Sequence, residues 1–286
     1  MAIRALLRAT GLGGPIRSAI QYMSPEARSR RLVSKSMSLF KKRYDSYWHD
    51  IVPDRAATKM VDAFDAVSRD GFVMIPDYLS TSRLEEVRKE VLNLPGLRDG
   101  KYVGDLPFIN RQNDGICAFG VTDAVPATHA ATVGNEELHS LARALFGKTA
   151  RLSASSILSK YDKDRVDSSE APHWDDWRVR LKMFIYLTDV DETSAPTLFV
   201  KGSVSNVPWR LEKDFASVYF PKGSAGGSWW PVDELGLEKV ICTGKAGSML
   251  VFDTRGLHAG TRLTGSPRIM LMNMYTTHMP FTHRVF

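Results

Sequence analysis

The clearest pattern of hydrophobic and polar positions lies in the second half of the chain. In residues 179–187 every odd position is apolar, whereas Arg180 and Lys182 alternate with these apolar residues. A period of two predicts a β-strand that has one face in the core. Further strands are predicted at 152–161, 197–200, 247–253 and 268–275.

The first half of the chain carries helical periodicity instead. Apolar residues recur at helical spacing in 55–68, 82–94 and 136–146. A capping box formed by Ser82 and Glu85 predicts the start of the second of these helices. A short strand at 72–75 is expected between the first two helices, and residues 98–135 are expected to be irregular. Helices followed by strands predict an α+β chain whose second half is a β-sandwich or barrel.

Length and composition favour one large domain. The chain has 286 residues, of which 43% are hydrophobic, so it can bury a full core. Its apolar runs are far shorter than the roughly 18 residues of a membrane-spanning helix, which predicts a soluble or peripheral protein. The two cysteines, Cys117 and Cys242, lack metal-ligand spacing and are expected to be core residues.

Positive charge is concentrated in the first 50 residues. They hold ten Lys or Arg and three Asp or Glu, a net charge of +7, whereas the whole chain has +6, so the remainder carries −1. A nearly neutral body argues against a basic groove, and no nucleic-acid partner is expected. We therefore separate a basic N-terminal arm, residues 1–50, from a domain at residues 51–286.

Three interpretations of the basic arm stay open. It is a solvated and partly helical tail, an amphipathic segment that contacts a membrane surface or a protein partner, or an organelle transit peptide. The transit peptide is considered because no acidic residue precedes Glu26. The expected location of the protein is the cytoplasm, with a membrane-peripheral or organelle-targeted protein as the alternatives.

Candidate metal chemistry begins directly before the strand at 179–187. His173 and Asp175 lie two positions apart, so their side chains point to the same side of an extended segment. An iron(II) that activates O2 needs open coordination positions, and proteins then supply two histidines and one carboxylate. His258 is the candidate for the third ligand. Asp176 should point to the opposite side and is not expected to bind iron.

Arg268 stands ten residues after His258, at the start of a predicted strand. It is expected to share one face of that strand with Met270, Met272 and Met274. Burying an unpaired guanidinium is costly, so an anionic ligand is expected beside it. Arginine can bind a carboxylate through two parallel hydrogen bonds, which suits a dicarboxylate co-substrate such as 2-oxoglutarate.

Two parts of the chain contain candidate substrate contacts. Residues 204–238 form a long segment that carries Trp209, Trp229 and Trp230, and such a segment is either a functional rim over the site or simple surface packing. Arg111 and Asn113 either line the pocket or are polar residues of a surface loop. With a neutral body and an aromatic rim, the expected substrate is a small or mid-sized organic molecule with some negative charge.

The order of these features resembles the phytanoyl-CoA dioxygenase family of iron(II)- and 2-oxoglutarate-dependent oxygenases, over residues 55–280. The similar segments are Gly71–Ser80, His173–Asp175, Tyr186–Val190, Gly247–Asp253, His258 and Arg268. The resemblance implies a double-stranded β-helix, which is a jelly-roll or cupin-like core, with flanking N-terminal helices. It also implies iron on His173, Asp175 and His258, and the distal carboxylate of 2-oxoglutarate on Arg268.

The same resemblance implies a reaction. It is a hydroxylation of the substrate by O2 with release of succinate and CO2, while desaturation and ring closure are other outcomes. The family's relatives that halogenate replace the metal-binding carboxylate by a small residue, so the presence of Asp175 argues against that chemistry.

Two segments depart from the family pattern. Many members have Asn-Gly where this chain has Ser194-Ala195, and the usual Pro-Gly-Ser-His appears as Lys201–Val204. Neither departure removes a metal ligand, but both lie on the substrate side. Ser156, on the strand before the metal motif, is the candidate for a second polar contact to 2-oxoglutarate.

Two alternative functions follow from the same residues. The first is a cupin-like metalloenzyme that does not use 2-oxoglutarate, and Arg268 argues against it. The second is a catalytically silent scaffold whose basic arm binds a membrane or a partner. The two histidines and the aspartate argue against the scaffold.

Overall fold

The structure is a computed structural model that describes residues 25–49, 51–94, 97–98, 101–102, 109–112, 115–119, 125–164, 170–175, 179–205, 210–211 and 232–277. These residues group into two units, of which one contains helix α3 (Pro25–His49) and the other contains the strands and their flanking helices. Within these ranges, no helix has the length and apolar character needed to cross a membrane. That residues 1–50 act as a separate arm stays a prediction.

The larger unit is built on a seven-stranded antiparallel sheet. Its strands, in spatial order, are β1 (Phe72–Ile75), β10 (Met249–Asp253), β7 (Arg180–Tyr186), β12 (Arg268–Thr276), β6 (Arg151–Lys160), β5 (Gly115–Phe119) and β4 (Ile109–Gln112). A second antiparallel sheet contains β11 (His258–Gly260), β8 (Thr197–Val200) and β9 (Lys239–Cys242), and a short hairpin pairs β2 (Leu97–Arg98) with β3 (Lys101–Tyr102). Two such sheets form the predicted double-stranded β-helix.

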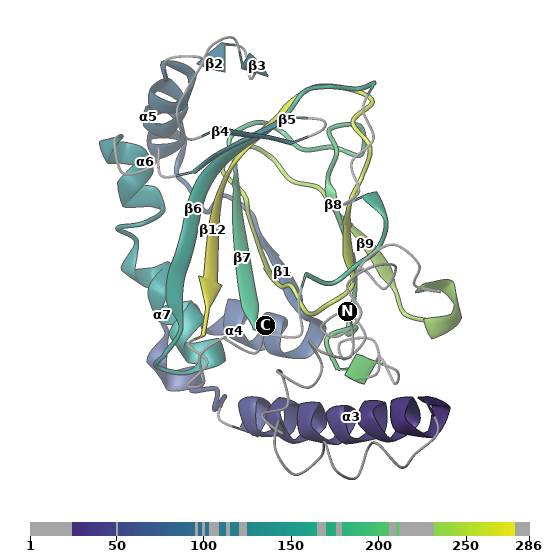
Figure 1. Ribbon diagram of the computed structural model, residues 1–286. Coiled ribbons are helices and arrows are strands. Elements are labelled where there is room, and N and C mark those ends of the chain that lie inside the picture. The colour runs from purple at the N-terminus through teal and green to yellow at the C-terminus, as the bar shows by residue number, and fades with distance from the viewer. Residues whose placement is uncertain are drawn as a thin grey trace. The chain divides into compact units, whose positions relative to one another are not determined.

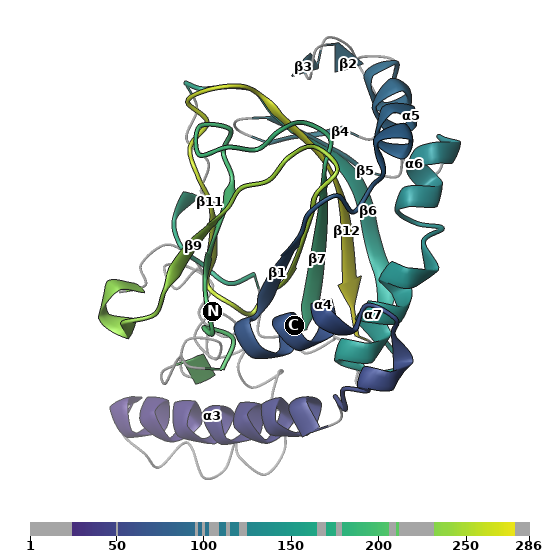
Figure 2. The same ribbon diagram turned by 180° about the vertical axis from the view of Figure 1, so that it is seen from behind.

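Helices cover the outer side of the seven-stranded sheet. They are η1 (Arg55–Ala57), α4 (Val61–Asp70), α5 (Thr81–Leu92), α6 (Pro126–Ala131) and α7 (Glu136–Phe146), with a further turn η4 (Val232–Leu235) before β9. Figures 1 and 2 show α5, α6 and α7 beside β6, with β8 and β9 on the opposite side of the larger sheet. Helix α7 buries Leu138, Leu141 and Leu145. Each buried leucine contributes about 1.5–3 kcal/mol to stability.

A glycine allows the sharp turn from α4 into β1. Gly71 adopts a left-handed conformation with φ of 88°, and its N–H donates to the carbonyl of Val67 at 2.9 Å. A Cβ at this position would lie 2.8 Å from Val204 and 3.0 Å from Phe199. Because only glycine permits both the conformation and the close approach, β1 can begin at once beside β10.

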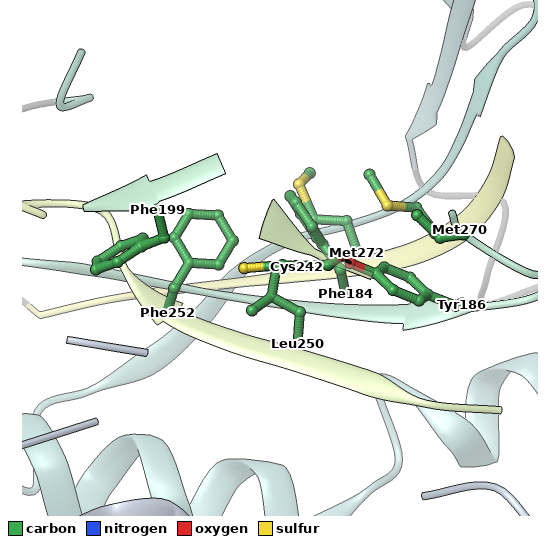
Figure 3. Close-up of a cluster of buried hydrophobic side chains, with 9 residues drawn as sticks. Phe184, Tyr186, Phe199, Cys242, Leu250, Phe252, Met270 and Met272 are labelled. Atoms are coloured by element: carbon green, nitrogen blue, oxygen red, sulfur yellow. Dashed lines mark hydrogen bonds between the residues drawn. The ribbon is translucent and has the colours of Figure 1, made fainter. Parts of the chain in front are cut away.

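Strand β7 is buried on both faces rather than on one. Its apolar odd positions are buried as predicted: Val179, Leu181, Met183, Ile185 and Leu187. Phe184 and Tyr186 on the other face are also buried, in a cluster between the two sheets that includes Phe199 and Phe252 (Figure 3). The hydroxyl of Tyr186 donates to the carbonyl of Cys242 at 2.8 Å and so links the two sheets.

Three local predictions are wrong. Residues 98–135, expected to be irregular, contain β4, β5 and α6, because β6 supplies the hydrogen-bond partners that β5 needs. Helix α5 is capped by Ser80 and not by Ser82, since the Ser80 hydroxyl accepts from the N–H of Arg83 at 3.4 Å. The expected helix at 55–68 is divided into η1 and α4.

Candidate active site

Backbone hydrogen bonds bring His173 and His258 together although they are far apart in the sequence. The N–H of each residue donates to the carbonyl of the other at 2.8 Å, which forms an isolated β-bridge. Their ring centroids are 4.6 Å apart. The N–H of Asp175 donates to the carbonyl of Thr254 at 3.2 Å. The segment before β7 therefore lies along the segment that leads into β11.

Both imidazoles are oriented by backbone carbonyls. Nδ1 of His173 lies 2.8 Å from the carbonyl oxygen of Ala171, and Nδ1 of His258 lies 2.9 Å from that of Gly256. Because a carbonyl only accepts, both Nδ1 atoms carry a proton, and in a neutral imidazole of this tautomer Nε2 has the free lone pair. Within the described ranges, the buried Nε2 of His258 has no hydrogen-bond partner. Such an atom fits a metal ligand.

The three predicted ligands converge as the sequence pattern indicates. Oδ1 of Asp175 lies 3.7 Å from Nε2 of His173 and 3.5 Å from Nε2 of His258. The ligand atoms of all three residues lie within 4.8 Å of one another, so a single metal ion between them could contact all three. Two imidazoles and one carboxylate are the donor set of non-haem iron(II) oxygenases. That they bind iron stays a prediction.

Close packing fixes the loop that carries His258. A Cβ on Gly256 would lie 2.2 Å from the ring of Phe199, so this position requires glycine. The N–H of Leu257 donates to the hydroxyl of Ser203 at 2.7 Å. Ser203 lies in one of the two segments that depart from the family pattern, and here it supports the loop beside a ligand.

The charges around the ligands favour metal binding. Burial by itself would raise the pKa of Asp175, but the Lys182 ammonium and His258 outweigh this and hold that pKa well below its usual range. Burial and the neighbouring His258 lower the pKa of His173, despite the raising effects of the Ala171 carbonyl and Asp175. The site therefore presents a charged carboxylate and a neutral imidazole, the forms that bind metals.

Lys182 is the site residue that sequence analysis missed. Its Nζ lies 2.7 Å from Oδ2 of Asp175. The alternating pattern of β7 placed Lys182 on the polar face of a strand expected to be buried on one side. The signal that could have found it is the alternation of Lys182, Phe184 and Tyr186, which places the lysine on the same face of the strand as two aromatic residues.

Arg268 lies in a contrasting environment at the start of β12. It is 8% exposed, and its Nη1 donates to the carbonyl of Ala195. In the part of the chain that the structure describes, no carboxylate pairs with it, and burial lowers its pKa. Ala195 itself has φ of 56°, a left-handed conformation at the position where many family members have glycine. A buried guanidinium without an acidic partner favours an anionic ligand.

The strand register places Arg268 and Lys182 on one face of the seven-stranded sheet, which we call the inner face. Lys182 pairs with Phe252 on β10 and with Met274 on β12. Arg268 pairs with Lys160, and it lies two same-face positions beyond Met272 along β12. The inner face carries, from the Lys182 end to the Arg268 end, Met274, Met272, Met270 and Arg268 along β12. This confirms that the three methionines and Arg268 share one face.

Ser156 lies between the two ends of the inner face. It pairs with Met272. Met272 is two same-face positions from Arg268 along β12 and one same-face position from Met274, the partner of Lys182. Its side chain is fully buried, and within the described ranges its hydroxyl has no hydrogen-bond partner. A buried hydroxyl without a partner is rare in folded proteins and fits a ligand contact. The proposed contact of Ser156 with 2-oxoglutarate stays a prediction.

The candidate substrate contacts are less well placed. The backbone of Arg111 lies on β4, where it pairs with Ile116, and Ile116 pairs with Ser159. Ser159 is the residue next to Lys160 on β6, so Arg111 is in register with a position one residue away from the pair of Lys160 and Arg268. Asn113, Trp209, Trp229 and Trp230 lie outside the described residues, as does Asp176. Their roles stay predictions.

Comparisons with known proteins agree with this geometry. The family model described as Phytanoyl-CoA dioxygenase (PhyH) matches residues 67–270. No curated protein sequence matches the chain. Similar solved structures include the non-heme alpha ketoglutarate dependent epimerase SnoN from nogalamycin biosynthesis, at 19% identity and a TM-score of 0.55, covering 76% of this chain and 82% of that one.

Two further structures show the same likeness. EctD from S. alaskensis, solved with 2-oxoglutarate and 5-hydroxyectoine, has 19% identity and a TM-score of 0.54, and 77% of each chain is covered. The carbocyclase SnoK from nogalamycin biosynthesis has 20% identity and a TM-score of 0.50, covering 79% of this chain and 87% of that one. At such low identity these likenesses support the double-stranded β-helix fold.

Proposed function

Because the chain belongs to the phytanoyl-CoA dioxygenase family, we propose that it is an iron(II)- and 2-oxoglutarate-dependent oxygenase that hydroxylates a small or mid-sized organic substrate. One observation carries this proposal. Asp175, one of three clustered metal-ligand side chains, pairs with Lys182 at one end of the inner face. Arg268, a buried cation with no acidic partner among the described residues, lies at the other end. A 2-oxo dicarboxylate complements both ends at once.

Each residue has a defined part in this proposal. His173, Asp175 and His258 hold iron(II) from one side and leave its other positions open. Arg268 binds the distal carboxylate of 2-oxoglutarate through two parallel hydrogen bonds, and the carbonyl of Ala195 orients its guanidinium. When bound, iron(II) supplies the redox chemistry by which O2 converts 2-oxoglutarate to succinate and CO2 and a substrate C–H bond to C–OH.

The remaining inner-face residues hold the reactants and exclude water. Ser156 donates a second hydrogen bond to 2-oxoglutarate, which satisfies a hydroxyl that has no partner among the described residues. Phe184, Phe252 and Met272 keep the space around the centre apolar. A fixed, dry geometry lowers the barrier by positioning the reacting groups, and it limits unproductive oxidation.

Hydroxylation is the proposed outcome, and the mass of the product tests it. SnoN and SnoK are described as an epimerase and a carbocyclase, so the same fold also accommodates other outcomes. Hydroxylation adds one oxygen atom to the substrate, epimerisation leaves its mass unchanged, and ring closure or desaturation removes two hydrogen atoms. Mass spectrometry of a metabolite extract incubated with the protein, iron(II) and 2-oxoglutarate separates these cases.

The proposal for substrate binding depends on the predicted aromatic rim. We propose that Trp209, Trp229 and Trp230, together with Arg111 and Asn113, contact a mid-sized organic molecule with some negative charge. The support is compositional, because the body of the chain carries almost no net charge while these residues offer aromatic rings and polar groups. Replacing Trp229 and Trp230 by alanine should weaken substrate turnover, and unchanged turnover would remove the rim from the proposal.

Turnover without a substrate tests the proposed enzyme class. Purified protein with iron(II), ascorbate and 2-oxoglutarate should form succinate slowly, and His173→Ala should abolish this. His139→Ala is the matched control, because Nε2 of His139 lies 2.7 Å from the carbonyl of Val133 and the residue lies outside the site. No succinate and no 2-oxoglutarate binding by the unaltered protein would contradict the proposal and favour a scaffold.

A further inference from the structure

Lys182 is a charged residue in an unusual place. It lies on the inner face of the central strand β7, where it pairs with Phe252 on β10 and Met274 on β12. Its side chain is only 20% exposed. Burying an ammonium group among apolar side chains is costly unless an acid compensates it. Among the described residues, Asp175 is its ion-pair partner, with Nζ 2.7 Å from Oδ2.

The two oxygens of Asp175 face different groups. Oδ1 lies 3.5 Å from Nε2 of His258 and 3.7 Å from Nε2 of His173, whereas Oδ2 is held by Lys182. The carboxylate is thus divided into a metal-facing oxygen and a lysine-facing oxygen. Building on the proposed function, we infer that Lys182 is a positioning residue that holds Oδ2, so that Asp175 binds iron(II) through Oδ1 alone.

The number of carboxylate oxygens on the metal affects how 2-oxoglutarate binds. A carboxylate binds a metal through one oxygen or through both. Iron(II) with two imidazoles and one carboxylate oxygen keeps the positions that a chelating 2-oxo acid and O2 need. If Oδ2 were free to turn towards the metal, it would compete for one of these positions. Lys182 prevents this by an ion pair and not by blocking the space.

This role differs from that of an ordinary buried ion pair. If Lys182 only offset the burial of Asp175, its replacement would change the stability of the protein without changing how the carboxylate binds a metal. A positioning residue affects the coordination itself. Because Asp175 becomes a stronger donor when the ammonium is lost, metal affinity should not fall, while 2-oxoglutarate binding weakens.

Crystal structures and calorimetry of the nickel(II)-loaded protein test the inference without turnover. In the unaltered protein we expect Oδ1 on the metal and Lys182 on Oδ2. In Lys182→Met we expect both oxygens on the metal, 2-oxoglutarate affinity lower by about tenfold, and no loss of nickel(II) affinity. Lys182→Arg, which keeps a positive charge that can pair with Oδ2, should restore the single-oxygen coordination and most of the 2-oxoglutarate affinity.

Two controls separate positioning from stability. Lys245→Met removes an exposed lysine that pairs with Asp189 at 2.9 Å, and it should change neither coordination nor affinity. Thermal unfolding shows whether each variant is folded. If Lys182→Met is not folded, the metal-loaded structure of the unaltered protein tests the inference through the position of Lys182.

The possible outcomes distinguish this inference from the proposed function. Single-oxygen coordination and unchanged 2-oxoglutarate affinity in Lys182→Met would overturn the inference alone, as would a metal-loaded structure of the unaltered protein in which Lys182 has left Asp175. Failure of the unaltered protein to bind nickel(II) or 2-oxoglutarate would overturn the proposed function itself.

Discussion

The charged groups at the two ends of the inner face differ in whether a group of opposite charge compensates them. At the metal end, Asp175 faces Lys182 and two imidazoles, so its negative charge is compensated and the lone pairs of the histidines stay free. At the other end, Arg268 donates to the carbonyl of Ala195, and no carboxylate among the described residues pairs with it. The first end is prepared for a cation and the second for an anion. A metal and a dicarboxylate together complete both.

The difference has an energetic consequence. Removing a partner at the metal end leaves a charged group buried without compensation, which destabilises the protein. Arg268 already lies in that unfavourable situation, and its desolvation cost is recovered only when an anion binds. Binding of an anionic ligand should therefore stabilise the protein by compensating the charge of Arg268, whereas the charge of Asp175 is already compensated without a ligand.

The largest effect is expected from removing the carboxylate at the metal end. Asp175→Ala should weaken iron(II) binding by more than about 100-fold, because it deletes a ligand rather than a supporting contact. Equilibrium dialysis followed by metal analysis measures this. Asp189→Ala, which removes an exposed aspartate outside the site, is the control. One tightly bound iron per chain in Asp175→Ala would show that the assigned ligand is wrong.

Arg268→Met should separate the two ends. The affinity for 2-oxoglutarate should fall by about 30- to 100-fold, since hydrogen bonds between charged groups are lost, while iron(II) affinity stays the same. Without ligand, the variant should be more stable by about 1–3 kcal/mol, because a buried charge is replaced by an apolar group of similar size.

Calorimetry and thermal unfolding check both parts of that prediction. Arg69→Met, which alters an exposed arginine paired with Asp70, is the control. A variant that binds 2-oxoglutarate as tightly as the unaltered protein, or that loses stability without ligand, would mean that Arg268 has a structural role only.

A smaller effect is expected between the two ends, at Ser156. Ser156→Ala removes one neutral hydrogen bond and should weaken 2-oxoglutarate binding by about three- to tenfold. The stability of the ligand-free protein should not fall, because the hydroxyl has no partner among the described residues. Ser153→Ala, on the same strand, is the control, since that hydroxyl donates to the carbonyl of Met274 at 2.9 Å. Reduced stability with unchanged affinity would contradict the proposed contact.

The smallest effect is expected at Ala195, which presents its carbonyl to Arg268. Ala195→Gly should relieve the left-handed backbone and raise the free energy of unfolding by up to about 1 kcal/mol. The affinity for 2-oxoglutarate should change by less than about twofold, because a backbone carbonyl makes the contact. A denaturant titration and calorimetry measure these values. A clear loss of stability would indicate that the methyl group packs favourably enough to outweigh the strain.

The sequence predicts the metal end better than the surrounding sheet. The spacing of His173 and Asp175 is local, so an extended segment suffices to put both side chains on one side. Arg268 and its three methionines also follow from alternation alone. The ion pair of Lys182 does not, because Asp175 precedes β7 and the contact depends on where the fold places Asp175 relative to that strand.

The missed elements have two different physical causes. Strand β5 contains Gly115 and little alternation, and it is defined by pairing with β6 rather than by its own residues. Ser82 and Glu85 have the spacing of a capping box and so predict a cap at Ser82, but the helix begins at Thr81 and its cap is Ser80, two residues earlier. Tertiary pairing decides the first case, and competition between two suitable serines decides the second.

The most direct test of the central claim compares two 2-oxo acids. The claim is that one molecule is held by the metal end and by Arg268 together. Anaerobic titration of the iron(II)-loaded protein, followed by its visible metal-to-ligand charge-transfer absorption, should show much tighter binding of 2-oxoglutarate than of 2-oxobutyrate, which lacks the distal carboxylate. Arg268→Met should remove that preference and keep the absorption. Equal binding of both acids by the unaltered protein, or a preference that survives in Arg268→Met, would contradict the claim.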